Sequence, residues 1–186
     1  MKFINNSNDL TRYLGVPVKK NIDIKSISTD TRSIKKGALF IAIKGDIFNG
    51  NDYVEIAISK EACLVITDDK KFKDSKNKKI IYVSNSILAL RNISRNIIKE
   101  YSGNIIGITG SNGKTTTTNI IANSLKNCSS TLKNFNNEIG VPLSIMNANR
   151  QSKSLVIEMG AAKINDIDYL SSFLKPNIGV ITNIGN

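Results

Sequence analysis

The feature that most constrains the fold is a glycine-rich segment between an apolar run and a run of helix-forming residues. Residues 105–109 read Ile-Ile-Gly-Ile-Thr, and Gly110-Ser111-Asn112-Gly113-Lys114-Thr115-Thr116 follows them. Glycines let backbone N–H groups approach a phosphate, a helix N-terminus adds a partial positive charge, and a lysine adds a full one. The segment therefore predicts a phosphate-binding loop between a buried strand and a helix.

This loop is a variant of the usual pattern, G-x-x-x-x-G-K-[ST], because Ile108 stands where that pattern has its first glycine. The seven residues from Gly110 to Thr116 are candidates for nucleotide binding. Lys114 would supply a catalytic positive charge, and the hydroxyl of Thr115 would be a ligand of Mg²⁺. The alternative is a glycine turn that does no more than precede a helix.

Strand-like and helix-like runs alternate along the chain, which predicts βαβ units and parallel sheets. In the second half the predicted strands are 105–109, 130–132, 155–157 and 178–182, and the predicted helices are 114–126, 141–147 and 166–174. In the first half the predicted strands are 39–43, 63–67 and 80–83, with a short helix at 54–60.

Between the two halves, Ser86 is predicted to cap the N-terminus of a further helix. Apolar residues recur along it at every third or fourth position: Ile87, Leu90, Ile93, Ile97 and Tyr101. The predicted fold class is therefore α/β, with a small N-terminal α/β domain at residues 1–84. A P-loop-type parallel α/β sheet, the first part of an incomplete central domain, is predicted at residues 85–186.

Composition excludes several classes of protein. The chain has 186 residues, of which 40% are hydrophobic, so it can bury a core. No apolar run approaches the roughly 18 residues of a membrane span, and the N-terminus turns polar too early for a secretory signal. The chain has no histidine, which excludes His-ligated metals and His-based catalysis in these residues. Two isolated cysteines suit a reducing, cytoplasmic compartment.

The net charge of +11 suggests nucleic acid as a partner, but the pattern of the charge does not favour it. Basic residues are spread along the chain, whereas a protein that binds the phosphate backbone more often gathers them on one face with aromatic residues between. The densest lysine cluster, at residues 70–79, has the character of a solvated loop. We therefore predict no nucleic-acid partner.

Three further segments carry candidate site residues. Glu158 ends the apolar run 155–157 and could bind Mg²⁺ beside the phosphate loop, although many strands end in a glutamate. Asn136 and Asn137 lie just before a predicted helix, where they could bind phosphate or sugar hydroxyls or could simply form a turn and cap the helix. In the first half, the candidates for substrate binding are Thr29, Asp30, Thr31 and Arg32, with an Asx-turn and a solvated arginine as the alternative.

With these segments taken together, the chain resembles the Mur ligases of peptidoglycan synthesis. The matching segments span nearly the whole chain in family order, and they are 30–45, 110–116, 134–142, 156–161 and 179–185. The asparagine-rich segment resembles the branch of the family that adds D-alanyl-D-alanine to UDP-N-acetylmuramoyl-tripeptide. Two positions depart from the family: Thr31 stands where serine is usual, and Asn51 stands where a histidine is common.

The resemblance implies an ATP-dependent ligase that works through an acyl phosphate. Its N-terminal domain would bind the UDP-sugar peptide and its central domain would bind ATP and Mg²⁺, with Lys114 and Glu158 as catalytic residues and Thr115 and Glu158 as metal ligands. Asn136 and Asn137 would contact substrate, and the enzyme would be a cytoplasmic monomer. The resemblance also implies that further strands and a C-terminal domain follow Asn186, so that these residues alone would bind ATP·Mg²⁺ weakly, catalyse no ligation and tend to aggregate.

Two alternatives to this function stay open. The related ligase that adds the third peptide residue, meso-diaminopimelate or lysine, shares the Asp-x-Arg and phosphate-loop segments. A non-catalytic nucleotide-binding module, or a GTPase-like switch, would also use such a loop. A GTPase is expected to carry an Asn-Lys-x-Asp segment, which the sequence lacks.

Overall fold

The computed structural model describes residues 2–18, 21–45 and 47–185, so Met1 and Asn186, the ends of the two predicted domains, lie outside it. The chain forms two compact units, one of Ile4–Asn92 and one of Ile93–Asn186 together with Met1–Phe3. The boundary between the units falls inside helix α3 (Ser86–Glu100), whereas the sequence predicted it before that helix. In the described part of the chain no helix has both the length and the apolar character needed to cross a membrane.

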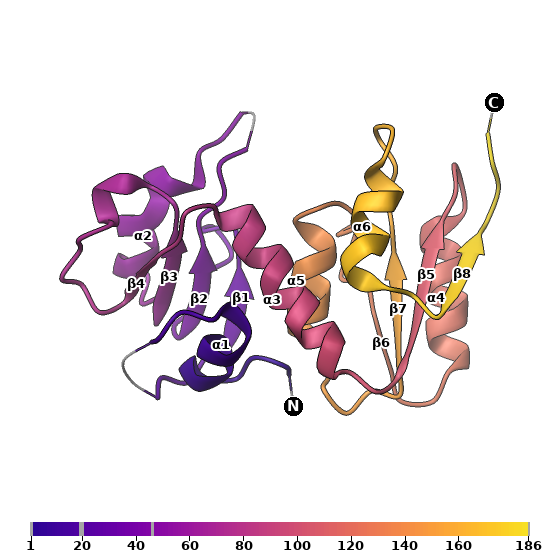
Figure 1. Ribbon diagram of the computed structural model, residues 1–186, viewed down its shortest axis with the longest axis horizontal. Helices are drawn as coiled ribbons and strands as arrows, with labels where there is room; N and C mark the ends of the chain where they lie inside the picture. The colour runs from indigo at the N-terminus through magenta and orange to yellow at the C-terminus, as the bar shows by residue number, and fades with distance from the viewer. Residues whose placement is uncertain (1, 19–20, 46, 186) are drawn as a thin grey trace. The chain divides into compact units, whose positions relative to one another are not determined.

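The first unit is built on a parallel sheet of four short strands (Figure 1). These are β1 (Ser26–Ser28), β2 (Ala38–Ile41), β3 (Leu64–Thr67) and β4 (Ile80–Tyr82), hydrogen-bonded in the order β1-β2-β3-β4. The two central strands are buried along their whole length, which explains their continuous apolar sequences. Helix α2 (Val54–Ser59) packs on this sheet, and helix α1 (Ser7–Leu14) precedes it in the chain.

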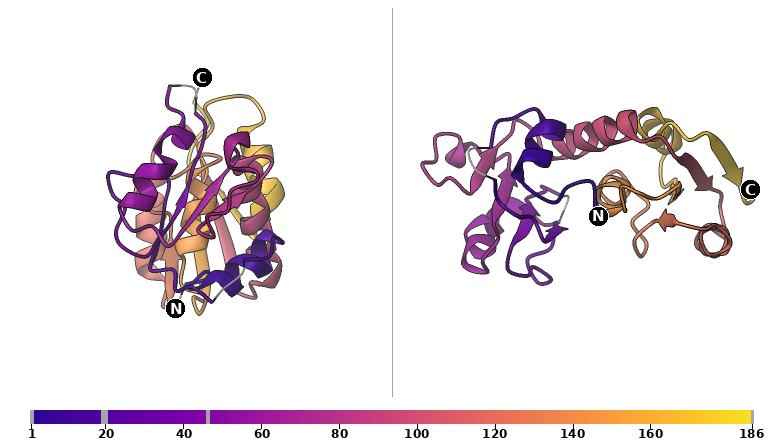
Figure 2. Two further views of the ribbon diagram at one scale, coloured as in Figure 1. Left: turned by 90° about the vertical axis from the view of Figure 1, so that its left-hand side faces the viewer. Right: turned by 90° about the horizontal axis from the view of Figure 1, so that it is seen from below.

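The second unit is also a four-stranded parallel sheet, ordered β6-β7-β5-β8. Its strands are β5 (Asn104–Thr109), β6 (Cys128–Ser130), β7 (Ser154–Glu158) and β8 (Ile178–Ile181), and its helices are α4 (Lys114–Ser124), α5 (Gly140–Asn147) and α6 (Asp166–Leu174). Helix α4 covers one face of the sheet and α6 the other (Figure 2). Parallel pairing in both sheets confirms the predicted α/β class.

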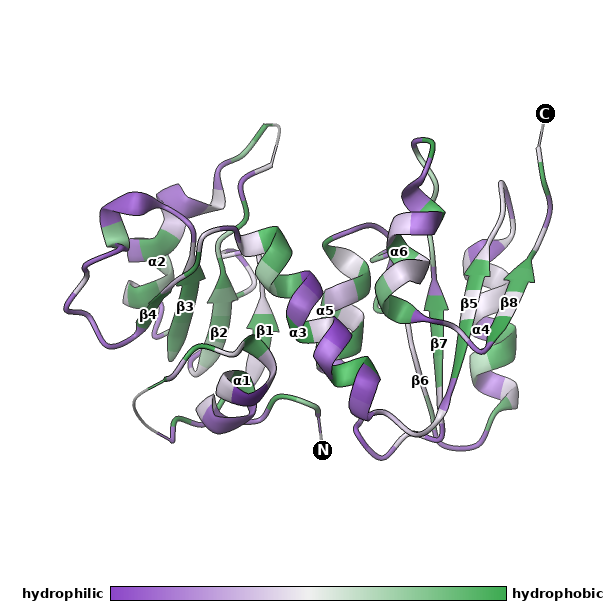
Figure 3. Ribbon diagram, in the orientation of Figure 1, coloured by the Kyte–Doolittle hydropathy of each residue, from purple (hydrophilic) through white to green (hydrophobic). Residues whose placement is uncertain are grey.

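Hydropathy follows this layering. Apolar residues colour the strands of both sheets, and polar residues colour most of the loops (Figure 3). At the β8 edge, however, apolar side chains face solvent: Ile178 is 49% exposed and Ile181 is 63% exposed. Strand β8 hydrogen-bonds to β5 on one side only within the described residues, so its other edge offers unpaired backbone groups.

A strand and a helix cap lie at positions displaced from those predicted. The strand predicted at 130–132 lies at Cys128–Ser130, because the polar pair Ser129-Ser130 pairs with β7 while Leu132 lies outside the sheet. The cap predicted at Ser86 is supplied by Asn85, whose side-chain oxygen accepts from the Leu88 N–H at 2.7 Å. Asparagine is as good an N-cap as serine, so a polar side chain does cap this helix, but one residue earlier than predicted.

Tyr101, near the end of α3, gives the second unit a pH-dependent contact. Its hydroxyl donates to the Ser152 carbonyl at 3.0 Å, and burial raises the pKa of Tyr101 to about 12. In the unfolded chain the phenol ionises near pH 10, so the unfolded state gains stability there while the folded state stays protonated. We expect the free energy of unfolding to fall as the pH rises from 10 towards 12, and to fall less steeply in Tyr101→Phe. Urea unfolding at a series of pH values measures this slope, and equal slopes in the two proteins would contradict the assignment.

Candidate functional site

The phosphate loop lies between the end of β5 and the start of α4, as its sequence predicted. Gly110 and Gly113 have φ values of 139° and 78°, in a region that side chains rarely adopt. A Cβ atom at Gly110 would also overlap the hydroxyl of Thr182. The loop is braced by the segment after β8, because the Asn112 N–H donates to the Asn183 side chain at 2.8 Å. The backbone is therefore held in a turn that only glycine permits at these positions.

Lys114 lies over this turn. Its ammonium donates to the Gly110 carbonyl at 2.6 Å and to the Ser111 carbonyl at 3.2 Å. The residue also lines a cavity of about 650 Å³, together with Asn136, Asn137 and residues 160–166. A full positive charge at the start of a helix, beside a cavity of this size, suits an anionic ligand such as a nucleotide phosphate.

Glu158 meets the loop because β5 and β7 are parallel neighbours, with Ile108 paired to Glu158. Carboxyl ends of parallel strands meet at one edge of a sheet, which is where open α/β sheets bind their ligands. The Thr115 hydroxyl donates to Glu158 Oε2 at 2.8 Å, and the Asn136 amide donates to Glu158 Oε1 at 2.7 Å. The predicted loop residue and the predicted carboxylate are thus in direct contact.

The surroundings of Glu158 fit a divalent cation. Its side chain is 2% exposed, and within the described residues no salt bridge joins it to a lysine or an arginine. A buried carboxylate without a positive partner is costly, and buried charges in proteins are usually paired or coordinate metals. Mg²⁺ binds oxygen ligands and commonly takes one or two from the protein and the rest from phosphates and water. The Thr115 hydroxyl and the Glu158 carboxylate form such an oxygen pair.

The two predicted asparagines have different contacts. Asn137 accepts from the Ile139 and Gly140 N–H groups, at 3.2 and 2.8 Å, so it caps the start of α5 as the turn alternative predicted. Asn136 instead turns its amide to Glu158. Both residues line the cavity beside Lys114, and contact of either with a substrate remains a prediction.

Gly140, the first residue of α5, lets the asparagine segment fold back on itself. A Cβ atom there would lie 2.5 Å from the Phe135 Cα, which is backbone and cannot rotate away. We expect Gly140→Ala to lower the free energy of unfolding by about 1–3 kcal/mol, the usual cost of overpacking. Gly179→Ala, at a position with open space, is the matched control in the same unit. Equal melting temperatures for the two variants would contradict this close approach.

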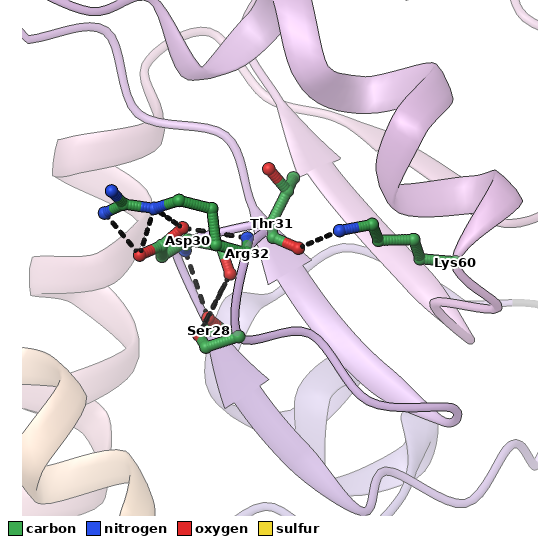
Figure 4. A network of polar contacts seen from close by, with 6 residues as sticks. Ser28, Asp30, Thr31, Arg32 and Lys60 are labelled. Atoms are coloured by element: carbon green, nitrogen blue, oxygen red, sulfur yellow. Dashed lines mark hydrogen bonds and ion pairs between the residues drawn. The ribbon is translucent and has the colours of Figure 1, made fainter.

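In the first unit the four predicted substrate residues gather on one cavity of about 290 Å³. Arg32 forms a two-point pair with Asp30, in which Nε and Nη2 donate at 2.9 and 2.8 Å (Figure 4). The Asp30 carboxylate also accepts from the Arg32 N–H, so this is the Asx-turn of the alternative interpretation. Hydrogen bonding to Asp30 raises the pKa of Arg32, whose side chain is 90% exposed. The turn therefore presents a solvated guanidinium at the rim of a cavity.

Aromatic residues of this cavity were not predicted from the sequence. Phe48 and Tyr53 line it together with Phe40, and Phe48 is 70% exposed. In the sequence, Phe48 follows Ile47 in a short turn-like segment bounded by Gly45 and Gly50, and an apolar pair in such a segment is the signal that could have identified it. Asn51, which departs from the family pattern, is buried, accepting from Thr67 at 2.7 Å and donating to Asp68 at 2.8 Å. Its contacts serve the fold, and it does not line the cavity.

Two family descriptions match this chain. "Mur ligase family, catalytic domain" matches residues 23–99, and "Mur ligase middle domain" matches residues 108–186. The first match covers the Arg32 cavity, and the second covers the phosphate loop from the end of β5 onward.

Several proteins similar to this chain are named UDP-N-acetylmuramoyl-tripeptide–D-alanyl-D-alanine ligase. The one from Buchnera aphidicola subsp. Baizongia pistaciae is 40% identical over 88% of this chain and 36% of its own length. The one from Bacillus subtilis is 35% identical over 92% of this chain and 38% of its own. The crystal structure of MurF ligase from Thermotoga maritima in complex with ADP has a TM-score of 0.74 and 32% identity, covering 86% of this chain and 38% of that one. The chain thus spans less than two fifths of the length of these relatives.

Proposed function

Because this chain belongs to the Mur ligase family, we propose that it carries the substrate-binding and nucleotide-binding parts of a peptidoglycan ligase. That ligase would use ATP to add D-alanyl-D-alanine to UDP-N-acetylmuramoyl-tripeptide, the reaction for which its relatives are named. The contact between Thr115 and Glu158 at the phosphate loop is the observation that carries the nucleotide half of the proposal.

In this proposal each of the two predicted domains has one task. Residues 1–84 bind the UDP-sugar peptide at the cavity of Thr29, Asp30, Thr31 and Arg32, and residues 85–186 bind ATP at residues 110–116. We also propose that the enzyme is monomeric and cytoplasmic and that it has no nucleic-acid partner. The free thiols of Cys63 and Cys128 support a reducing compartment.

The reaction would proceed in two steps, phosphorylation of the tripeptide and then formation of the amide bond. A carboxylate oxygen of the tripeptide bonds to the γ-phosphorus of ATP as the bond to ADP breaks; the amine of D-alanyl-D-alanine then attacks the acyl phosphate, loses a proton and displaces inorganic phosphate. Positioning and charge neutralisation dominate such transfers, so the chain need not supply a nucleophile. Lys114 would neutralise charge on the transferring phosphate. Thr115 and Glu158 would hold Mg²⁺, which would supply further positive charge to neutralise the phosphates of the nucleotide.

Calorimetric titration of the 186-residue chain with ADP tests the nucleotide half of the proposal. We expect weak binding that requires Mg²⁺ and that does not occur with adenosine, the nucleoside that lacks the phosphates. Adenosine binding with the same affinity, or no ADP binding in the presence of Mg²⁺, would overturn this half of the proposal.

Ligation is tested in a chimera in which these residues replace the matching part of the Bacillus subtilis relative. We expect phosphate release with UDP-N-acetylmuramoyl-tripeptide and D-alanyl-D-alanine. Release only with meso-diaminopimelate or lysine acting on the dipeptide substrate would favour the ligase that adds the third residue. Nucleotide binding without any ligation in the chimera would favour a non-catalytic module.

Arg32 allows a separate test of the first cavity. We expect Arg32→Ala to weaken binding of UDP-N-acetylmuramoyl-tripeptide about 10-fold or more, since hydrogen bonds to charged groups are the strong ones. The melting temperature should stay unchanged, because the guanidinium is 90% exposed and, among the described residues, its ion pair is with Asp30 of its own turn. Arg150→Ala, which removes an exposed arginine outside this cavity, is the control. Equal affinity in the two variants would remove Arg32 from the substrate site.

A further inference from the structure

The role of Asn136 follows from what its amide touches. We infer that Asn136 is a positioning residue that holds the Glu158 carboxylate in the orientation a bound cation needs, and that it acts through Glu158 and not through a sugar or peptide substrate. The inference rests on the proposed nucleotide site. It replaces the substrate contact predicted for Asn136 with a different function.

Each oxygen of the Glu158 carboxylate receives one donor, and the two donors come from different elements. The Thr115 hydroxyl, in the first turn of α4, bonds to Oε2, and the Asn136 amide, in the segment before α5, bonds to Oε1. A carboxylate held at both oxygens cannot rotate about its last side-chain bond. Loss of the Asn136 donor would leave Oε1 buried without this partner and would free that rotation.

The backbone holds Asn136 in place on the same strand end. Its carbonyl accepts from the Gly160 N–H at 2.7 Å, two residues beyond Glu158. A Cβ atom at Gly160 would lie 3.0 Å from both Cγ and Oδ1 of Asn136, so glycine leaves the room that the amide occupies. The main chain and the side chain of Asn136 thus both form hydrogen bonds to the segment that carries Glu158.

An amide is chemically suited to this task. It donates a hydrogen bond to the carboxylate without bringing a charge, so the negative charge of Glu158 stays available to a cation. A lysine or arginine in the same place would neutralise Glu158 and compete with Mg²⁺. Partners that orient metal ligands in this way typically account for 10–100-fold in metal affinity when they are removed.

The test measures the Mg²⁺ dependence of ADP binding to the 186-residue chain, with no sugar or peptide substrate present. We expect Asn136→Ala to raise the Mg²⁺ concentration for half-maximal binding about 10-fold or more. Gly160→Ala, which displaces the amide without removing it, should shift the value in the same direction. Asn119→Ala removes an exposed asparagine of α4 and should leave the value unchanged.

A double-mutant cycle shows whether Asn136 acts through Glu158. In a Glu158→Gln background, Asn136→Ala should produce no further change in Mg²⁺ dependence, while thermal melting confirms that each variant is folded. An undiminished effect in that background, or unchanged Mg²⁺ dependence in a folded Asn136→Ala, would overturn the inference alone. Absence of Mg²⁺-dependent ADP binding in the parent chain would overturn the proposed function, and the inference with it.

Discussion

Replacing Lys114 with alanine is expected to reduce ligation by the chimera about 10²–10⁴-fold, the usual loss when a preorganised charge is removed from a transition state. Within the described part of the chain, the hydrogen bonds of this ammonium go to carbonyl oxygens of its own loop, Gly110 and Ser111, so its loss removes little from the core. The melting temperature should therefore change little. Initial rates of phosphate release, measured at saturating ATP, give the comparison.

Lys126→Ala is the matched control for this substitution, because Lys126 is an exposed lysine just beyond α4 and outside the cavity of Lys114. It should leave the rate of ligation unchanged. If Lys114→Ala retained near-parental turnover, the glycine-rich segment would be a structural turn, which is the alternative that its sequence leaves open.

Replacing Phe40 with alanine is expected to destabilise the first unit by about 3–5 kcal/mol, the usual cost of truncating a buried phenylalanine. Phe40 is 1% exposed and packs in a cluster with residues of β3 and α2 that include Val65, Val54 and Ala57. Whole domains are typically stable by only about 5–15 kcal/mol, so this variant should populate unfolded forms under mild conditions. Urea unfolding followed by circular dichroism measures the difference.

Phe48→Ala makes the same truncation at a side chain that is 70% exposed in the same unit. It should change the free energy of unfolding by far less, since little apolar surface returns to water. Equal losses in the two variants would show that Phe40 does not contribute more to the core than a surface residue does.

The sequence predicted those helices and strands that are encoded by a continuous run of several residues with a clear apolar pattern or a clear end. Helix α6 has the bounds predicted for it, Asp166–Leu174, and the strands β3 and β5 differ from their predicted bounds by one residue. Helix α1 and strand β1 were not predicted from the sequence. Strand β1 has only three residues, and the described buried side chains of α1 are Ser7, Leu10 and Tyr13, so neither presents a long apolar pattern.

The candidate site also has a part that the sequence predicts and a part that it does not. The phosphate loop is contiguous in the chain, so its residues could be identified together. Contact between Thr115 and Glu158 depends on the pairing of β5 with β7, and the sequence of neither segment specifies which strands are neighbours in the sheet. The divergent contacts of Asn136 and Asn137 depend on one residue facing a carboxylate and the next facing a helix end, which composition cannot distinguish.

Helix α3 belongs to both compact units, and this has a consequence for how the protein can be divided. Leu90 is buried in the part assigned to the first unit, and Ile93 and Ile97 are buried in the part assigned to the second. A break at the loop on either side of α3 would deprive one unit of residues that it buries. The two units therefore cannot be separated at this junction with both complete, and gene fission or recombination there would leave one product without residues that it buries in the intact chain.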